Sequence, residues 1–137
     1  MKIQFLGGAG TVTGTCFYLQ TSGLKMLMDC GMAQGSNGDS VNRESFSFSP
    51  AEIDYLFLTH AHIDHSGLVP KLAKDGFRGR IISTSATADL AELMLYDSAH
   101  IQETDSVWQT KKALRAGKEP VLPLYTVDDV RAVVPLF

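Results

Sequence analysis

Apolar and polar residues follow a strand-like pattern in the N-terminal part of the chain. They alternate over residues 2–5, which predicts a first strand that leads into a glycine-rich loop over residues 7–14. β-branched and aromatic residues fill residues 15–20, and a further apolar strand is expected over residues 24–28, ending at Asp29. Because no helix follows the glycines, a tight hairpin connection is favoured over a nucleotide-binding loop.

The middle of the chain has the pattern of a buried strand followed by a helix. Residues 34–50 are rich in Ser, Gly and Asn and are expected to form a long surface loop. Residues 53–59 are a nearly continuous apolar run, which is typical of a strand buried on both faces. A helix is then predicted to begin near Ser66, to accept Pro70 in its first turn and to end at Gly76.

The last third of the chain predicts one short strand and three helices. The strand covers residues 80–84, and Thr87 is expected to cap the helix that follows. A second helix is predicted over residues 105–117 with Trp108 as its anchor, and residues 126–129 have the pattern of a capped helix start. Strands that alternate with helices predict an α/β fold, with a mixed β-sheet and flanking helices.

Three of the four histidines and one aspartate fall within residues 60–65, directly after the buried strand. Imidazole nitrogens with a carboxylate oxygen favour Zn²⁺, with Mn²⁺ and iron as alternatives. His60 and His62 point to the same side if the backbone stays extended, whereas Asp64 and His65 lie where the chain must turn. Two such pairs would serve two neighbouring ions. An ordinary polar loop is disfavoured, because buried imidazoles without an ion are hard to satisfy with hydrogen bonds.

Several segments resemble one protein family. Residues 59–67 (THAHIDHSG) resemble the second motif of the metallo-β-lactamase fold superfamily, and residues 27–31 (LMDCG) resemble its first. The glycine-rich segment 7–15 and the helical segment 97–103 resemble the beta-CASP branch, whose members are RNA-processing exo- and endonucleases. The resemblance covers nearly the whole chain. It implies that the chain forms the N-terminal half of the four-layer αββα sandwich of this superfamily.

The resemblance also implies roles for five residues. His60 and His62 would hold one Zn²⁺, and Asp64 and His65 would face a second. Asp64 would also position a hydroxide between the two ions, which would attack the phosphorus of RNA in line. Asp29 would orient the histidine loop from behind, as outer carboxylates commonly do.

Some motifs of the resembled family are not found before Phe137. These are two later metal motifs, namely a histidine in a strand turn and a bridging aspartate, and the inserted beta-CASP domain that clamps RNA. Residues 1–137 are therefore expected to be a partial metallo-β-lactamase domain that is inactive alone and binds zinc weakly. The uncovered face of such a half sandwich predicts a homodimer.

The function expected for the intact protein is zinc-dependent hydrolysis of RNA phosphodiester bonds. Two alternatives remain open at this point. One is a hydrolase of the same fold that acts on another substrate, such as a thioester or a lactam. The other is a non-catalytic module that binds RNA or protein.

Composition and charge change this picture little. The 137 residues are 45% hydrophobic and 20% charged, which is typical of one globular domain and argues against disorder or a membrane protein. The N-terminus lacks a signal segment, so a cytoplasmic protein is expected. The net charge of −3 provides no general attraction to nucleic acid, so a surface that binds RNA must be local.

One candidate for such a surface is the basic cluster of Lys111, Lys112 and Arg115, although a solvated helix face is favoured there. Cys16 and Cys30 are expected to be reduced core residues.

Overall fold

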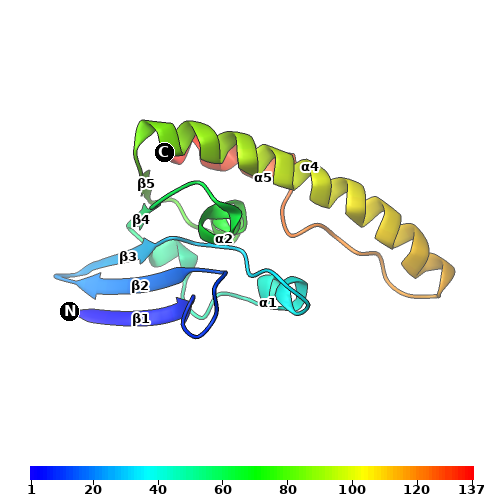
Figure 1. Ribbon diagram of the computed structural model, residues 1–137, viewed down its shortest axis with the longest axis horizontal. Helices are drawn as coiled ribbons and strands as arrows, with labels where there is room; N and C mark the ends of the chain where they lie inside the picture. Colours follow the sequence, from blue (N-terminus) through cyan, green and yellow to red (C-terminus); the bar gives the residue numbers. More distant parts are fainter.

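A mixed five-stranded sheet forms one side of the computed structural model, which describes residues 1–137 (Figure 1). The strand order in space follows the order in the chain. The first three strands pair antiparallel, and the last two join them in parallel, which confirms the predicted mixed sheet. The strands are β1 (Lys2–Gly7), β2 (Cys16–Thr21), β3 (Leu24–Met28), β4 (Tyr55–Phe57) and β5 (Arg80–Ile82).

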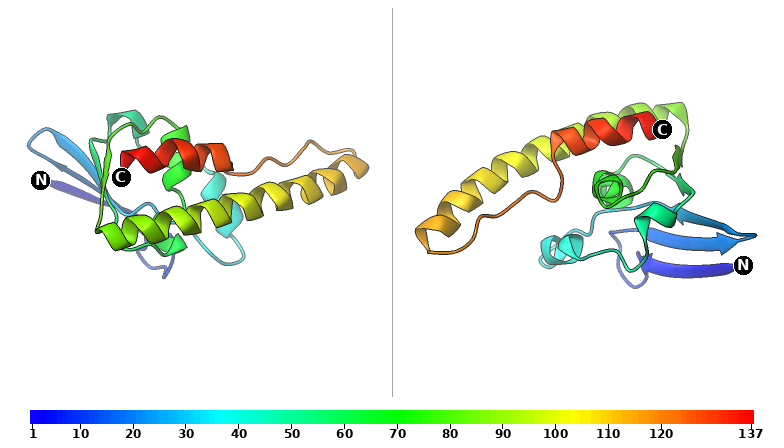
Figure 2. Two further views of the ribbon diagram at one scale, coloured as in Figure 1. Left: turned by 90° about the horizontal axis from the view of Figure 1, so that it is seen from above. Right: turned by 180° about the vertical axis from the view of Figure 1, so that it is seen from behind.

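Five α-helices and two short 3₁₀ helices complete the fold. α3 and α5 contact each other, and α5 also packs along the first part of α4 (Figure 2). None of the helices combines the length and the apolar character needed to cross a membrane. The helices are α1 (Gly38–Arg43), η1 (Pro50–Glu52), α2 (Ile63–Ser66), α3 (Val69–Lys74), α4 (Ser85–Arg115), α5 (Val127–Val133) and η2 (Val134–Leu136).

One face of the sheet carries the hydrophobic core. Tyr18, Leu27, Leu56 and Ile81 pair with one another across four strands, and all four are buried. They belong to the same apolar cluster as buried residues of α3 and α5. Because side chains alternate between the two faces of a strand, the residues that follow them point the other way.

The opposite face of the sheet is open to solvent. Phe17, Met28, Phe57 and Ile82 pair across the same four strands, and Phe57 and Ile82 remain 38% and 42% exposed. The expectation that residues 53–59 form a strand buried on both faces is therefore wrong. An uninterrupted apolar run indicates that a strand can be buried on both faces, but burial also requires a second layer to cover it.

This apolar face predicts self-association. A second copy of the chain can bury the same row of side chains around a two-fold axis, so we expect oligomers that grow with concentration in sedimentation velocity. Phe57→Lys places a charge in the middle of the row and should weaken association at least about tenfold, because an unpaired ammonium is costly to bury. Val12→Lys, in the exposed glycine-rich loop, is the matched control. A concentration-independent monomer would contradict the prediction.

The segment predicted as a long surface loop contains a helix. Within residues 34–50, α1 is held by the buried side chain of Asn42, whose amide nitrogen donates to the Ala33 carbonyl and whose oxygen accepts from the Ala33 N–H, at 2.9 and 2.8 Å. The Ser, Gly and Asn content gives no helical signal, so this helix depends on a tertiary contact. Phe46 and Phe48, in the same segment, pack against the core.

The two helices predicted between Thr87 and residue 117 are one continuous helix, α4, of 31 residues. Its N-cap is Thr84 and not Thr87, because the Thr84 hydroxyl accepts a hydrogen bond from the Thr87 N–H at 3.2 Å. Trp108 is 65% exposed, so the prediction that it anchors a helix is wrong. The predicted capped start of the last helix is confirmed by a capping box between Thr126 and Asp129.

Candidate metal centre

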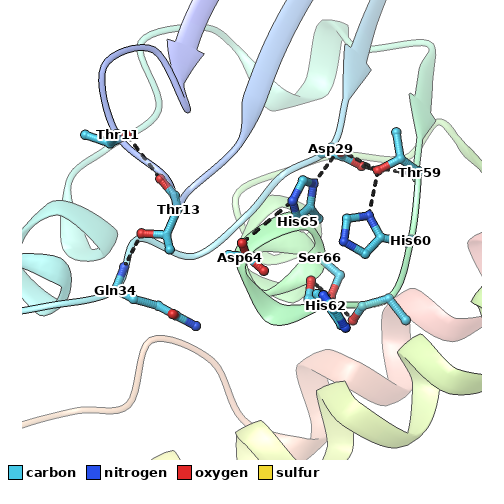
Figure 3. Close-up of polar contacts among 11 residues, drawn as sticks. Thr11, Thr13, Asp29, Gln34, Thr59, His60, His62, Asp64, His65 and Ser66 are labelled. Carbon is cyan, nitrogen blue, oxygen red and sulfur yellow. Dashed lines mark hydrogen bonds and ion pairs between the residues drawn. The ribbon is translucent and has the colours of Figure 1, made fainter.

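The predicted histidine cluster lies between the end of β4 and the start of α3 (Figure 3). The ring centres of His60 and His62 are 4.8 Å apart, and those of His60 and His65 are 4.0 Å apart. Asp64 Oδ2 lies 3.7 Å from His65 Nε2. The structure thus brings the four predicted metal ligands together beyond the carboxyl end of a parallel strand, where ligand sites of open α/β sheets occur.

The turn that separates the two pairs of ligands is a single helical turn, α2. His62 is its N-cap and has an extended backbone (φ −57°, ψ 145°), so His60 and His62 precede the helix while Asp64 and His65 lie within it. The His62 carbonyl accepts hydrogen bonds from the His65 and Ser66 N–H groups, both at 2.9 Å. The side chain of His62 is exposed and takes no part in this capping.

Asp29 lies behind the cluster and contacts it directly. Its side chain is 2% exposed, and its carboxylate accepts hydrogen bonds from the Thr59 N–H at 2.8 Å and from His65 Nδ1 at 2.8 Å. The Thr59 hydroxyl also lies 2.8 Å from Asp29 Oδ2. These are the contacts that the predicted orienting role of Asp29 requires.

Thr59 is the residue that sequence analysis did not single out. A hydroxyl has one proton, and a carboxylate only accepts, so Thr59 donates its proton to Asp29. The Thr59 oxygen must then accept from His60 Nδ1, which lies 3.0 Å away. His65 Nδ1 likewise carries the proton that it donates to Asp29. In the neutral form of each ring, Nε2 is therefore unprotonated, and this is the form of imidazole that binds a metal ion.

Neighbouring segments of backbone hold α2 in place. The N–H groups of Cys30 and Met32 donate to the carbonyls of His65 and Ile63, at 2.8 and 3.0 Å. The N–H of Thr15, at the end of the glycine-rich loop, donates to the Asp64 carbonyl at 2.9 Å. That loop therefore borders the cluster. The residues that follow β3 therefore pack against the histidine loop and hold it by backbone hydrogen bonds.

Gly31 allows this close approach. A Cβ atom at this position would lie 1.7 Å from the carbonyl oxygen of Asp64 and 2.8 Å from the His65 nitrogen. No L side chain fits there without moving α2. The sequence contained one signal for Gly31, namely its position in the segment 27–31. That segment resembles a family motif, but the resemblance does not show what the glycine does.

The donor set fits zinc in its chemistry. Two imidazoles have Nε2 free and a carboxylate lies beside them, although no three His, Cys, Asp or Glu side chains aim their donor atoms at one common point. The hydrogen bond of Cys30 with Cys16, together with burial, raises the pKa of the Cys30 thiol well above the usual value. Cys16 and Cys30 are both free and buried, as predicted, although Cys30 lies beyond the end of β3.

The other histidine of the chain lies elsewhere. His100 is exposed on α4, and no side-chain partner engages its ring. Glu103, one turn away, accepts a hydrogen bond from the Val127 N–H at 3.1 Å and so fastens the start of α5. The two side chains therefore do not form a ligand pair.

Comparison with known proteins identifies relatives of the chain. It is 42% identical over 103 residues to Ribonuclease TTHA0252 of Thermus thermophilus, a match that covers 75% of this chain and 24% of the relative. It is 32% identical over 127 residues to transcription termination factor FttA of Methanocaldococcus jannaschii, covering 90% and 20%. It is 33% identical over 124 residues to cleavage and polyadenylation specificity factor 73 of Drosophila melanogaster, covering 88% and 18%.

These relatives belong to the beta-CASP branch that the sequence resembles, and the chain spans about a quarter of their length or less. The family profile described as "Metallo-beta-lactamase superfamily" matches residues 9–132, from the glycine-rich loop to the last helix. With that match across most of its length, and with the histidine loop at the position that the family motif predicts, the chain belongs to the metallo-β-lactamase superfamily.

Proposed function

We propose that the intact protein hydrolyses phosphodiester bonds of RNA, with zinc bound at the histidine loop that residues 1–137 supply. The observation that carries the proposal is the arrangement behind the loop, in which Asp29 and Thr59 leave Nε2 of His60 and His65 free to bind a metal. The choice of RNA is supported by the relatives, two of which are named as a ribonuclease and as a cleavage factor.

The roles proposed for the side chains are those that the family resemblance implies. His60 and His62 would hold one zinc ion, and Asp64 and His65 would face a second. When bound, zinc would activate a water molecule near neutral pH and stabilise negative charge on the phosphate. The Asp64 carboxylate is half-buried and lies 3.7 Å from His65 Nε2. By the resemblance, Asp64 would also position the attacking hydroxide. Asp29 has no contact with the substrate in this scheme, since it is buried behind the imidazoles.

A panel of substrates tests the proposal. The protein is incubated with zinc and with single-stranded RNA, a thioester or a β-lactam, and product is measured for each. We expect RNA to be cleaved and the thioester and the β-lactam to remain intact. A chelator should abolish the cleavage of RNA, and added zinc should restore it. Hydrolysis of the thioester or the lactam with none of RNA would show a different substrate on the same fold. No turnover of any substrate by the zinc-loaded protein would favour a non-catalytic binding role.

A further inference from the structure

We propose that the far end of α4 is a binding surface for single-stranded RNA, separate from the histidine loop. The surface, termed the α4 tip, consists of Trp108, Lys111, Lys112 and Arg115. The choice of RNA among polyanions rests on the proposed function, whereas the surface itself is argued from the structure.

The second half of α4 is not needed to cover the core. The buried residues of this helix are Ala91, Leu95 and Ala99, all in its first half. Beyond them the helix projects from the body of the protein, and the chain returns beside it as an extended segment (Figures 1 and 2). A projecting helix with no buried residue makes little contribution to folding, so its surface is free to serve another purpose.

The projecting arm is held in one conformation. The Thr110 hydroxyl donates to the Val121 carbonyl and accepts from the Val121 N–H, both at 3.0 Å. Gln102 accepts from the Leu124 N–H at 3.2 Å, which ties the returning segment to the helix nearer the body. Because these contacts fix the arm before any ligand arrives, binding there has a low ordering cost.

Three cations at the tip have no anionic partner. Lys111, Lys112 and Arg115 form no ion pair and no side-chain hydrogen bond, although the chain as a whole carries a net charge of −3. Basic residues in the last turn of a helix also interact favourably with its dipole, which explains Lys112 and Arg115 in part. That effect does not explain a solvent-exposed tryptophan beside them.

Trp108 supplies an aromatic surface next to these charges. Its ring is 65% exposed, and Lys112 Nζ lies 5.5 Å from the ring centre. Together with Ala116, the four tip residues line a hollow of about 350 Å³. In a single strand, bases alternate with phosphates, and each base exposes a face for stacking. The exposed ring can stack on a base while the neighbouring cations contact the phosphates. Double-stranded RNA hides those faces, so a single strand is the better ligand.

The test measures binding without cleavage. Anisotropy of a fluorescein-labelled 12-nucleotide oligouridine is followed in EDTA, over a range of salt concentrations, and the fluorescence of the single tryptophan is recorded. We expect the RNA to quench Trp108. Trp108→Ala should weaken binding roughly five- to 100-fold, since stacking contributes about 1–3 kcal/mol per base. Joint replacement of the three cations by alanine should reduce the salt slope by about 2, at about 0.7 per lost phosphate contact.

The controls separate the possible outcomes. Lys2→Ala removes a positive charge from β1, more than 100 residues before the α4 tip in the sequence. This variant should leave the affinity for RNA nearly unchanged. Trp108→Phe should recover part of the lost affinity. Unchanged affinity and salt slope in the tip variants would overturn the proposal and favour an acidic protein as the partner. If the tip binds RNA but the protein cleaves none, only the proposed function fails; if RNA is cleaved while the tip variants bind normally, only this inference fails.

Discussion

Replacing His62 by alanine in the intact protein is expected to abolish RNA hydrolysis and to leave the fold intact. The imidazole is a predicted zinc ligand, and loss of the activated water should lower kcat/KM by several orders of magnitude. Its backbone carbonyl, not its side chain, makes the hydrogen bonds that start α2, and the side chain is exposed. The free energy of unfolding should therefore change by no more than about 0.5 kcal/mol.

The measurement combines initial rates on single-stranded RNA in excess zinc with urea unfolding of the same preparations. His100→Ala is the matched control, because it removes an exposed histidine from α4 that has no side-chain partner. We expect that variant to retain full activity. A His62→Ala protein that cleaves RNA at the normal rate would end the ribonuclease proposal for this loop.

Asp29→Asn is expected to weaken zinc binding by about 10- to 100-fold, the usual effect of losing an outer carboxylate. The amide keeps one acceptor oxygen, but its NH₂ group only donates. It cannot replace the carboxylate oxygen Oδ2, which accepts from both His65 Nδ1 and the Thr59 hydroxyl. Asp29 has a φ of +60°, and asparagine tolerates this left-handed conformation, so the substitution changes the charge without straining the backbone. Because one donor loses its buried partner, we also expect a loss of stability of about 1–3 kcal/mol.

Zinc affinity is measured by competition with a chromophoric chelator, and the tautomers of the imidazoles are read from ¹H–¹⁵N NMR spectra of the zinc-free protein. We expect the proton of His65 to leave Nδ1 in a substantial fraction of molecules. Asp54→Asn is the control, since the Asp54 carboxylate accepts a hydrogen bond from the Lys25 N–H, away from the metal loop. Normal zinc affinity with unchanged tautomers in Asp29→Asn would show that Asp29 has only a structural role.

Several features of this protein could be predicted from short stretches of sequence. Residues 60–65 combine three histidines and an aspartate after an apolar run, and this local pattern was enough to place the cluster at the end of β4. The capping box at Thr126 and Asp129 was equally visible, because a capping box joins residues three positions apart. Such features depend on neighbours along the chain, so periodicity and spacing reveal them.

The tertiary structure decided the features that depend on distant residues. Thr59 lies 30 residues from Asp29 and His65 lies 36 from it, yet these contacts determine which imidazole nitrogen is free. The open second face of β4 and the exposure of Trp108 also depend on which other elements cover them. An apolar residue can be buried only where another layer meets it, and a hydrogen-bond network forms only where the fold brings its members together. For that reason the sequence alone identified the metal ligands to test, while the arrangement behind them and the free surfaces around them became visible only in the folded chain.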